Sequence, residues 1–199
     1  MADLEKTGKN LEGRGFRVHR FASGAEAAEF LVQTLHGTSI GIGGSVTIDT
    51  LGVYDRICES NEVFWHWKNH APETRERAGK AETYLCSANG VSENGETVNI
   101  DGFGNRVAGT IYGPERVFLV VGRNKIAPDL TGAIDRARNI AAPLNARRLN
   151  RHTPCAVGEP RCHDCRSPEK ICGVMTVFFM PPTSIKEFHV ILVDEDLGY

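Results

Sequence analysis

The sequence VFLVVG, residues 117–122, is a continuous apolar run that ends at a glycine. Such a short run is typical of a strand that is buried on both faces of a helix-covered sheet. The polar residues Arg123, Asn124 and Lys125 follow it directly. Lys125 would then stand at the carboxyl end of a buried strand, where an anionic ligand can bind. A solvated lysine is the alternative.

Strand and helix patterns alternate on both sides of this run. Ser23 begins a helix with Glu26 three residues later, which is a capping box, and Asn94-Gly95 predicts a hairpin turn within residues 91–100. The alternation, closed by a final pair of strands, predicts an α/β fold with a layered sheet and flanking helices, but it does not give the strand order. Further strands are predicted at residues 16–21, 39–42, 62–65, 84–87, 175–180 and 188–193. Helices are predicted at residues 1–15, 23–35, 48–59, 72–81, 105–111 and 129–142, with a further helical turn to 149.

The length and charge of the chain narrow the class of protein. At 199 residues the chain can bury one core, so a single domain over residues 1–199 is predicted. A formal net charge of −2 and a pI of about 6.4 give no general case for a nucleic-acid or anionic-membrane partner. Residues 1–16 are polar, and no run approaches the roughly 20 apolar residues of a membrane span. We therefore expect a cytoplasmic protein with no membrane span and no nucleic-acid partner; a homo-oligomer stays open.

A glycine-rich loop lies between a predicted strand and a predicted helix. Its sequence is GIGGSVT, residues 41–47. Backbone N–H groups at such a position can hold a phosphate or carboxylate, although the spacing matches neither the Rossmann fingerprint nor a P-loop. Close packing of helix on strand is the alternative for the glycines, and helix capping is the alternative for the hydroxyls. The candidate ligand-binding residues are Gly41, Gly43, Gly44, Ser45 and Thr47.

A block dense in Asn, Asp, Glu and Gly covers residues 87–113. Polar residues at the strand ends of an α/β sheet gather near the ligand crevice. Arg106 can contact a carboxylate or phosphate with two parallel hydrogen bonds. Asn/Asp turns and an Arg–Asp surface pair are the alternative. The candidates in this block are Asn89, Asn99, Asp101, Asn105 and Arg106.

Four of the six cysteines lie within eighteen residues, in the order C-x6-C-x2-C-x6-C. Four thiolates complete a tetrahedral shell for zinc or an iron–sulfur cluster, and the central C-x2-C pair has the usual chelate spacing. Glycines and prolines predict that residues 152–173 form a loop that folds back on itself. We favour zinc over an iron–sulfur cluster; unligated thiols and two disulfides stay open, although a reducing cytosol disfavours disulfides. The candidate metal ligands are Cys155, Cys162, Cys165 and Cys172.

Other polar side chains near these motifs have two interpretations each. His152, His163 and Asp164 are alternative metal ligands or solvated loop residues. An aromatic and basic patch is either a stacking surface for a flat ligand or, as we favour, a partly buried loop. It contains His66, Trp67, Lys68 and His70. A run of arginines along the late helix is most often a solvated face. These are Arg136, Arg138, Arg147, Arg148 and Arg151.

Three long strings in the chain resemble the LUD domain, the lactate-utilisation family formerly called DUF162. They are GIGGSVT, SANGVSENGETVNIDGFGNRVAGTIYGPERVFLVVGRNKI and RARNIAAPLNARRL. The ending TPCAVGEPRCHDCRSPEKICG and FHVILVDEDLGY resembles a subgroup with extra cysteines. The match covers residues 11–199, nearly the whole chain. The ferredoxin-type repeat CxxCxxCxxxCP of longer, cluster-bearing relatives is missing.

The resemblance implies a fold like the group of ribose-phosphate isomerase, CoA transferase and formyltetrahydrofolate cyclo-ligase. It implies a pocket between the GIGGS loop and Asn89, Asp101, Asn105 and Arg106. Family members are linked to oxidation of L-lactate, with partner subunits that carry iron–sulfur clusters. Fold analogy does not by itself establish an activity.

Three functions remain open from the sequence. The first is a protein that binds a small anionic metabolite, accessory to lactate or 2-hydroxy-acid utilisation beside iron–sulfur redox subunits, with a structural zinc. The second is an electron-transfer protein with an iron–sulfur cluster on the four cysteines. The third is a CoA-transferase-like enzyme in which Glu93 or Asp101 is the nucleophile. Glu93 lies in a Ser-Glu-Asn-Gly string like that around the catalytic glutamate of one class of CoA transferases, but the hairpin turn also needs this Asn-Gly.

Overall fold

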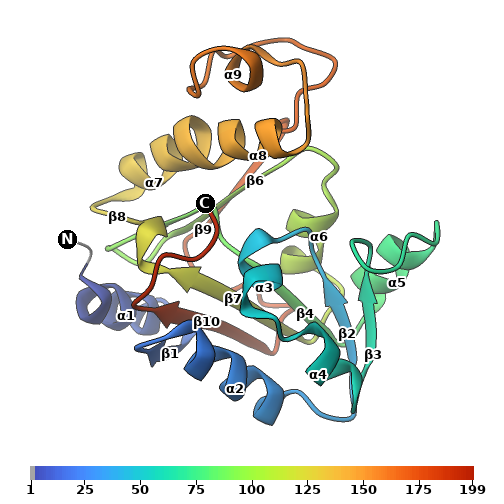
Figure 1. Cartoon of the computed structure of the whole chain (residues 1–199). Helices are drawn as coiled ribbons and strands as arrows, with labels where there is room; N and C mark the ends of the chain where they lie inside the picture. The colour runs from blue at the N-terminus through green and yellow to red at the C-terminus, as the bar shows by residue number, and fades with distance from the viewer. Residues whose placement is uncertain (1–2) are drawn as a thin grey trace.

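The computed structural model describes residues 3–199 and is built around a six-stranded parallel sheet (Figure 1). All neighbouring strands in this sheet run parallel. The central strand comes from VFLVVG, and its residues Val117, Leu119 and Val121 are fully buried, as predicted. In spatial order the strands are β1 (Arg17–Phe21), β10 (Glu187–Val193), β7 (Arg116–Gly122), β4 (Thr83–Ser87), β2 (Ser39–Ile42) and β3 (Glu62–Trp65).

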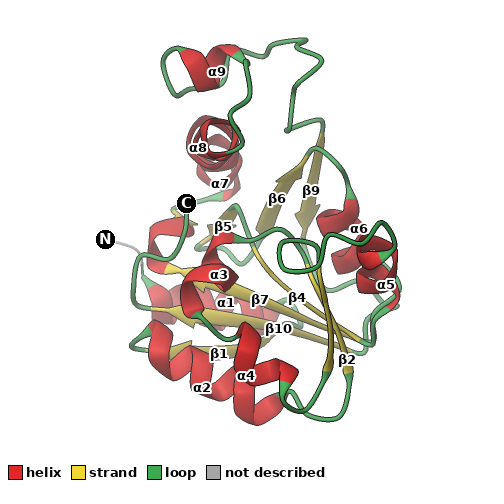
Figure 2. Cartoon of the chain, turned by 45° about the vertical axis from the view of Figure 1, so that its right-hand side comes forward, coloured by secondary structure: helices red, strands yellow, loops and turns green. Residues whose placement is uncertain are grey.

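Helices cover both faces of this sheet, so the layered α/β fold is confirmed (Figures 1 and 2). Val117, Leu119 and Val121 pack into the core beneath α1 and α5, while Phe118 and Val120 pack beneath α2, α3 and α4. Successive side chains of β7 point to opposite faces of the sheet, and both faces are covered by helices, which explains why every residue of the run is apolar. The helices are α1 (Leu4–Gly13), α2 (Gly24–Thr34), α3 (Val46–Leu51), α4 (Tyr54–Cys58), α5 (Thr74–Lys80), α6 (Asn105–Ile111), α7 (Leu130–Arg136), α8 (Ala142–Arg148) and α9 (Pro154–Val157). A 3-10 turn, η1 (Arg123–Lys125), follows β7, and a π-helical segment, η2 (Ala137–Ala141), joins α7 to α8.

A second, smaller sheet stands beside the first. It contains the predicted hairpin, which turns at Asn94 and Gly95, where the φ angle of Gly95 is 93°. Its apolar side packs against α7 and η2 through residues such as Val98 and Ala137. In spatial order its strands are β8 (Ile126–Ala127), β5 (Gly90–Ser92), β6 (Thr97–Asp101) and β9 (Val174–Phe178).

The structure supplies the strand order that the sequence left open, and it divides one predicted helix. The last two strands do not pair with each other, because β9 joins β6 in the small sheet while β10 lies between β1 and β7. The helix predicted over residues 48–59 is two helices, since Gly52 takes a left-handed conformation with φ 65° and ends α3. Ser23 caps α2 as predicted, but Glu26 accepts the Ala22 backbone N–H at 2.9 Å and not the Ser23 N–H that a full capping box would use.

The first two residues of the helix predicted over residues 1–15, Met1 and Ala2, lie outside the described residues; the rest of the prediction corresponds to α1. Within residues 3–199, no helix combines the length and the apolar character that a membrane crossing needs.

Candidate functional site

A cavity of about 600 Å³ opens at the carboxyl ends of β2 and β4. The chain leaves β2 toward β3 but leaves β4 toward β7, so the two connections diverge. In open α/β sheets, ligands bind at such a divergence. The loop after β2 contributes residues 44–47 and the end of β4 contributes residues 87–89, while α8 and residues 168–171 close the other side. Figures 1 and 2 both place α8 opposite α3.

The glycine loop contributes hydroxyl groups to this cavity. Ser45 accepts a hydrogen bond from the Ile48 amide at 3.2 Å, so it caps α3. The Thr47 hydroxyl lies 3.2 Å from the Leu197 carbonyl oxygen and 2.7 Å from the Lys125 Nζ atom. Gly44, Ser45 and Thr47 all line the cavity, as expected. The Ser45 hydroxyl therefore caps α3, while the Thr47 hydroxyl accepts a hydrogen bond from the buried Lys125 side chain.

Gly41 and Gly43, two other candidates from this loop, are not among the residues that line the cavity. A Cβ atom on Gly41 would lie 2.0 Å from the Ala78 carbonyl oxygen of α5. A Cβ atom on Gly43 would lie 2.9 Å from the Arg106 side chain. Close packing therefore explains the glycine at both positions, because a larger residue would not let α5 approach Gly41 or the Arg106 side chain approach Gly43 so closely.

Lys125 is a buried cation at the base of the cavity. Lys125 is the last residue of η1, and its Nζ atom donates to the hydroxyls of Thr47 at 2.7 Å and Ser87 at 2.8 Å. In the described part of the chain no carboxylate forms an ion pair with it. Burial, together with the nearby positive charges of Arg136 and Arg106, lowers its pKa to about 7. When it is protonated, Lys125 is a positive charge in the cavity that no carboxylate of residues 3–199 pairs with.

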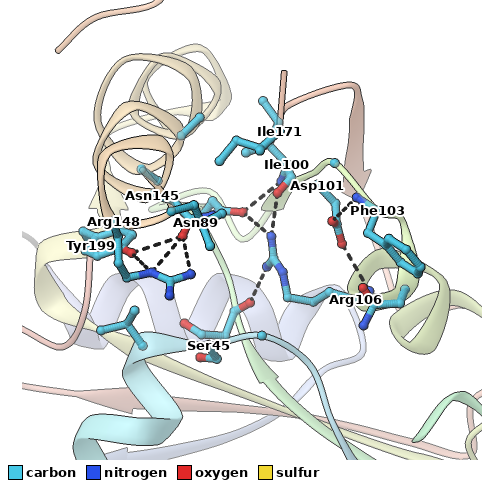
Figure 3. Close-up of a pocket in the computed structure, with 18 of the residues that line it drawn as sticks. Ser45, Asn89, Ile100, Asp101, Phe103, Arg106, Asn145, Arg148, Ile171 and Tyr199 are labelled. Atoms are coloured by element: carbon cyan, nitrogen blue, oxygen red, sulfur yellow. Dashed lines mark hydrogen bonds between the residues drawn. The ribbon is translucent and has the colours of Figure 1, made fainter. Parts of the chain in front are cut away.

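Arg106 is committed to the protein. Its guanidinium donates to the carbonyl oxygens of Ser87 at 3.0 Å and Ile100 at 2.6 Å (Figure 3). It also donates to the side-chain oxygens of Asn89 at 2.7 Å and Asn99 at 2.5 Å. We expected this guanidinium to be available to a ligand. Arg106 does line the cavity, but its N–H groups bind β4, β6 and the Asn89 side chain and so fasten these segments to α6.

Asp101 organises the beginning of α6, whose first residue is Asn105. The Asp101 carboxylate accepts four backbone N–H groups, which belong to Phe103, Gly104, Arg106 and Val107 (Figure 3). A carboxylate that caps a helix in this way is a weak candidate for a nucleophile. The expected Arg–Asp pair is thus made through the Arg106 backbone and not through its guanidinium.

The mouth of the cavity contains Arg148, one of the arginines that we had assigned to a solvated helix face. The Arg148 Nε atom donates to the Tyr199 hydroxyl at 2.7 Å, and the Nη2 atom donates to the Asn145 side chain at 2.8 Å (Figure 3). The guanidinium lies 4.6 Å from the centre of the Trp67 ring. The spacing of Asn145 and Arg148 on one face of α8 was a usable signal, whereas nothing in the sequence indicated Tyr199.

His66 adds a polar atom without a partner. It follows β3 and lines the cavity, and its Nδ1 atom is buried without a hydrogen-bond partner among residues 3–199. Burial lowers the His66 pKa, and the Arg75 charge lowers it further. Arg75 in turn stacks on the exposed ring of Phe103 at 5.0 Å. Three residues of the aromatic and basic patch, His66, Trp67 and His70, therefore line the cavity, whereas Lys68 does not.

The profile of the LUD domain matches residues 4–193 of this chain. The chain belongs to the LUD domain family. Among solved structures, the crystal structure of a DUF162 family protein from Deinococcus radiodurans is similar. It has 13% sequence identity and a TM-score of 0.55, over 96% of this chain and 95% of that chain. That likeness supports the fold alone. No curated protein matches the chain.

The candidate nucleophile Glu93 of this LUD domain lies outside the cavity. It sits in the β5–β6 turn and accepts the Lys6 ammonium at 2.9 Å and the Asp3 backbone N–H at 3.1 Å. The hydrogen bond from Lys6 lowers the Glu93 pKa, and the Asp3 contact adds to this. The position favours the interpretation of Ser-Glu-Asn-Gly as a hairpin turn.

The four cysteines of the LUD domain lie between α8 and β9. Among residues 3–199, no three Cys, His, Asp or Glu side chains are placed together as a metal site. The alternative ligands have other partners: His152 contacts Glu169, His163 contacts the Glu159 carbonyl, and Asp164 pairs with Arg138. The segment between the last two cysteines, residues 168–171, lines the cavity.

Proposed function

We propose that this LUD-domain protein binds a small organic anion, with the carboxylate or phosphate group of the ligand next to Lys125. The observation that carries the proposal is the buried Lys125 ammonium, whose hydrogen-bond partners in the described chain are two neutral hydroxyls. A buried charge is costly unless it is paired. A bound anion would supply the missing charge, so this site favours an anion over a neutral ligand of the same size.

The volume and lining of the cavity support the same conclusion. About 600 Å³ is within the usual range for a small-molecule site. Arg136 is also buried close by, and among residues 3–199 its guanidinium donates to the carbonyl oxygens of Asn124 and Asn89. Lys125, Arg106 and Arg136 therefore act together as a positive field, which a low-dielectric wall strengthens. The unpartnered Nδ1 atom of His66 offers a second polar contact for the remainder of the ligand.

The physiological role that we propose follows from the family. As a LUD domain, the protein would act in lactate or 2-hydroxy-acid utilisation as an accessory binding protein, together with iron–sulfur redox subunits. The ligand class and the family agree, because a 2-hydroxy acid and its 2-oxo product both carry a carboxylate. Cytoplasmic location is part of this proposal.

The test is a screen of thermal stability with carboxylates, phosphates and CoA esters at equal ionic strength. A ligand that binds only the folded state stabilises it by about 2.7 kcal/mol at one hundred times its Kd. We expect L-lactate, pyruvate or another small anion to raise the midpoint of unfolding, and the neutral amide of the same acid to have no effect. If none of the anions raises the midpoint more than chloride does, the proposal fails.

The affinity for a carboxylate is expected to fall as the pH rises above about 7. The pKa of Lys125 is about 7 in the free protein, and a bound anion would raise it because the anion favours the protonated ammonium. Binding above the free pKa must therefore take up a proton, so the Kd should rise by up to about tenfold per pH unit. Below that pKa the Kd should level off.

Calorimetric titrations from about pH 6 to 9, in buffers of different ionisation enthalpy, measure both the Kd and the protons taken up. A carboxylate is the correct ligand, since its own pKa near 3.5 lies far below this range, whereas a phosphate ester titrates near 6. A constant Kd with no proton uptake would mean that Lys125 does not face the anion.

A further inference from the structure

The loop between α8 and β9 carries four cysteines that the anion site does not use. Figures 1 and 2 show α9 beyond α8, away from the main sheet, with the chain then returning to β9. From Gly158 to Gly173 the chain forms neither helix nor strand. Three contacts fasten this loop to the helices beneath it: Arg147 donates to the Gly158 carbonyl at 2.5 Å, Asn139 accepts the Cys162 amide at 2.8 Å, and Arg138 pairs with Asp164.

All four thiols are free and half-buried, and they lie within one stretch of the chain, residues 155–172. Two cations adjoin the thiols. The Arg138 guanidinium lies 3.4 Å from the Cys162 Sγ atom, and the Lys170 ammonium donates to the Cys165 carbonyl at 3.2 Å. Positive charge next to cysteines favours thiolates, the form that binds metal.

The thiols are not drawn together into a coordination shell in residues 3–199. Nothing in the secondary structure prevents them from closing, because Cys162, Cys165 and Cys172 lie in the irregular segment and only Cys155 lies in a helix, the single turn α9. A metal could therefore gather the four sulfur atoms by loop movement alone. The other potential ligands nearby are engaged with Glu169, Glu159 and Arg138, which leaves an all-sulfur set.

The same loop forms one wall of the anion cavity. Residues 168–171, between Cys165 and Cys172, line it. The backbone of Ile171 packs directly on Gly102, where a Cβ atom would lie 2.7 Å from the Ile171 Cα atom. The Cys172 side chain also packs against the core between the small sheet and α7. Any ion that holds Cys165 and Cys172 therefore holds this wall at both ends.

We propose that one zinc ion binds this loop through four thiolates and thereby fixes residues 168–171 as a wall of the cavity. The ligands are Cys155, Cys162, Cys165 and Cys172. The four thiols release their protons as the metal binds, and the bound state has no open position, as in structural zinc sites. The role of the wall in ligand binding rests on the proposed function of the cavity; the metal site itself does not.

The first experiment measures metal content and absorption on untagged protein prepared without oxygen. We expect about one zinc per chain and no visible band. The double variant Cys162→Ser, Cys165→Ser should lose the zinc, whereas the exposed and separate Cys58→Ser should keep it. Four irons per chain with a broad visible band, or two disulfides, would overturn the zinc assignment. So would a metal-free protein whose four thiols react freely with a thiol reagent.

Unfolding of the double variant would not obscure the result, because the wild-type chain allows a second test. Zinc is removed with a chelator and replaced with Co²⁺ alone, whose thiolate charge-transfer bands report the number of sulfur ligands. Amide hydrogen exchange is then compared with and without zinc. We expect the amides of residues 166–172 to exchange at least tenfold more slowly with zinc, and those of the β5–β6 turn to be unchanged. Equal exchange rates with and without zinc would overturn the proposal that zinc fixes residues 168–171.

These outcomes separate the two proposals. If zinc binds and protects the loop while no anion stabilises the protein, the metal site stands and the function proposed for the cavity fails. If anions bind with an affinity that depends on Lys125 while the protein never takes up zinc, the function proposed for the cavity stands and the metal site fails.

Discussion

Replacing Lys125 with methionine is expected to abolish the thermal stabilisation by anions while leaving the protein folded. The variant removes the ammonium at the base of the cavity but keeps a side chain of similar length. Both hydroxyl partners retain an acceptor, since Thr47 contacts the Leu197 carbonyl at 3.2 Å and Ser87 contacts the Ala88 carbonyl at 3.2 Å. The stabilisation expected at one hundred times the wild-type Kd, about 2.7 kcal/mol, should fall to near zero.

The matched control is Lys80→Met. Lys80 is exposed, pairs with Glu76 one turn away in α5 and does not line the cavity. This variant should keep the full response to anions, and its stability should change by less than about 0.5 kcal/mol. Differential scanning calorimetry with and without L-lactate measures both effects. An undiminished anion response in Lys125→Met would place the ligand elsewhere.

Replacing Gly41 with alanine is expected to destabilise the fold without changing the chemistry of the cavity. The new Cβ atom would lie 2.0 Å from the Ala78 carbonyl oxygen and 2.7 Å from its carbon. These are backbone atoms of α5, so the helix must move away from β2 and open the core around it. Overpacking of this kind costs about 1–3 kcal/mol, and a clash with backbone belongs at the upper end of that range. For a chain of this size, the midpoint should fall by about 6–12 °C.

Gly79→Ala provides the control in the same helix. No heavy atom lies within 4 Å of its Cβ position, and Gly79 is helical with no left-handed φ angle. Alanine there should raise the stability by about 0.5–1 kcal/mol. Thermal unfolding of both variants, with and without anion, separates packing from binding. Should Gly41→Ala keep its stability and lose the anion response, the original ligand-binding interpretation of Gly41 would be correct.

The sequence analysis located most of the cavity for a local reason. Gly44, Ser45 and Thr47 follow one strand, and Asn89 and Lys125 follow two others, so the carboxyl ends of parallel strands brought them together. The roles of these residues were harder to predict. Arg106 has the side chain of a ligand site, yet its guanidinium binds the Ser87 carbonyl oxygen, 19 residues away in the sequence, and no local pattern contains that partner. Asp101 is instead occupied by the backbone N–H groups of the turn that follows it, which is the Asn/Asp-turn alternative.

The sequence by itself determined the buried central strand, the layered α/β class, the hairpin at Gly95, the LUD family and the four-cysteine spacing, because each of these depends on neighbours along the chain. Only the tertiary structure decided that β9 and β10 separate into two sheets, that Arg148 and Tyr199 meet at the mouth, and that the cysteine loop borders the anion cavity. Tertiary structure also decided that Lys125 is buried with no counter-ion among residues 3–199, since its charge environment comes from α3, β4, α6 and α7. Contacts between residues far apart in sequence depend on the packing of whole layers, and the sequence encodes that packing only through the sum of many weak interactions.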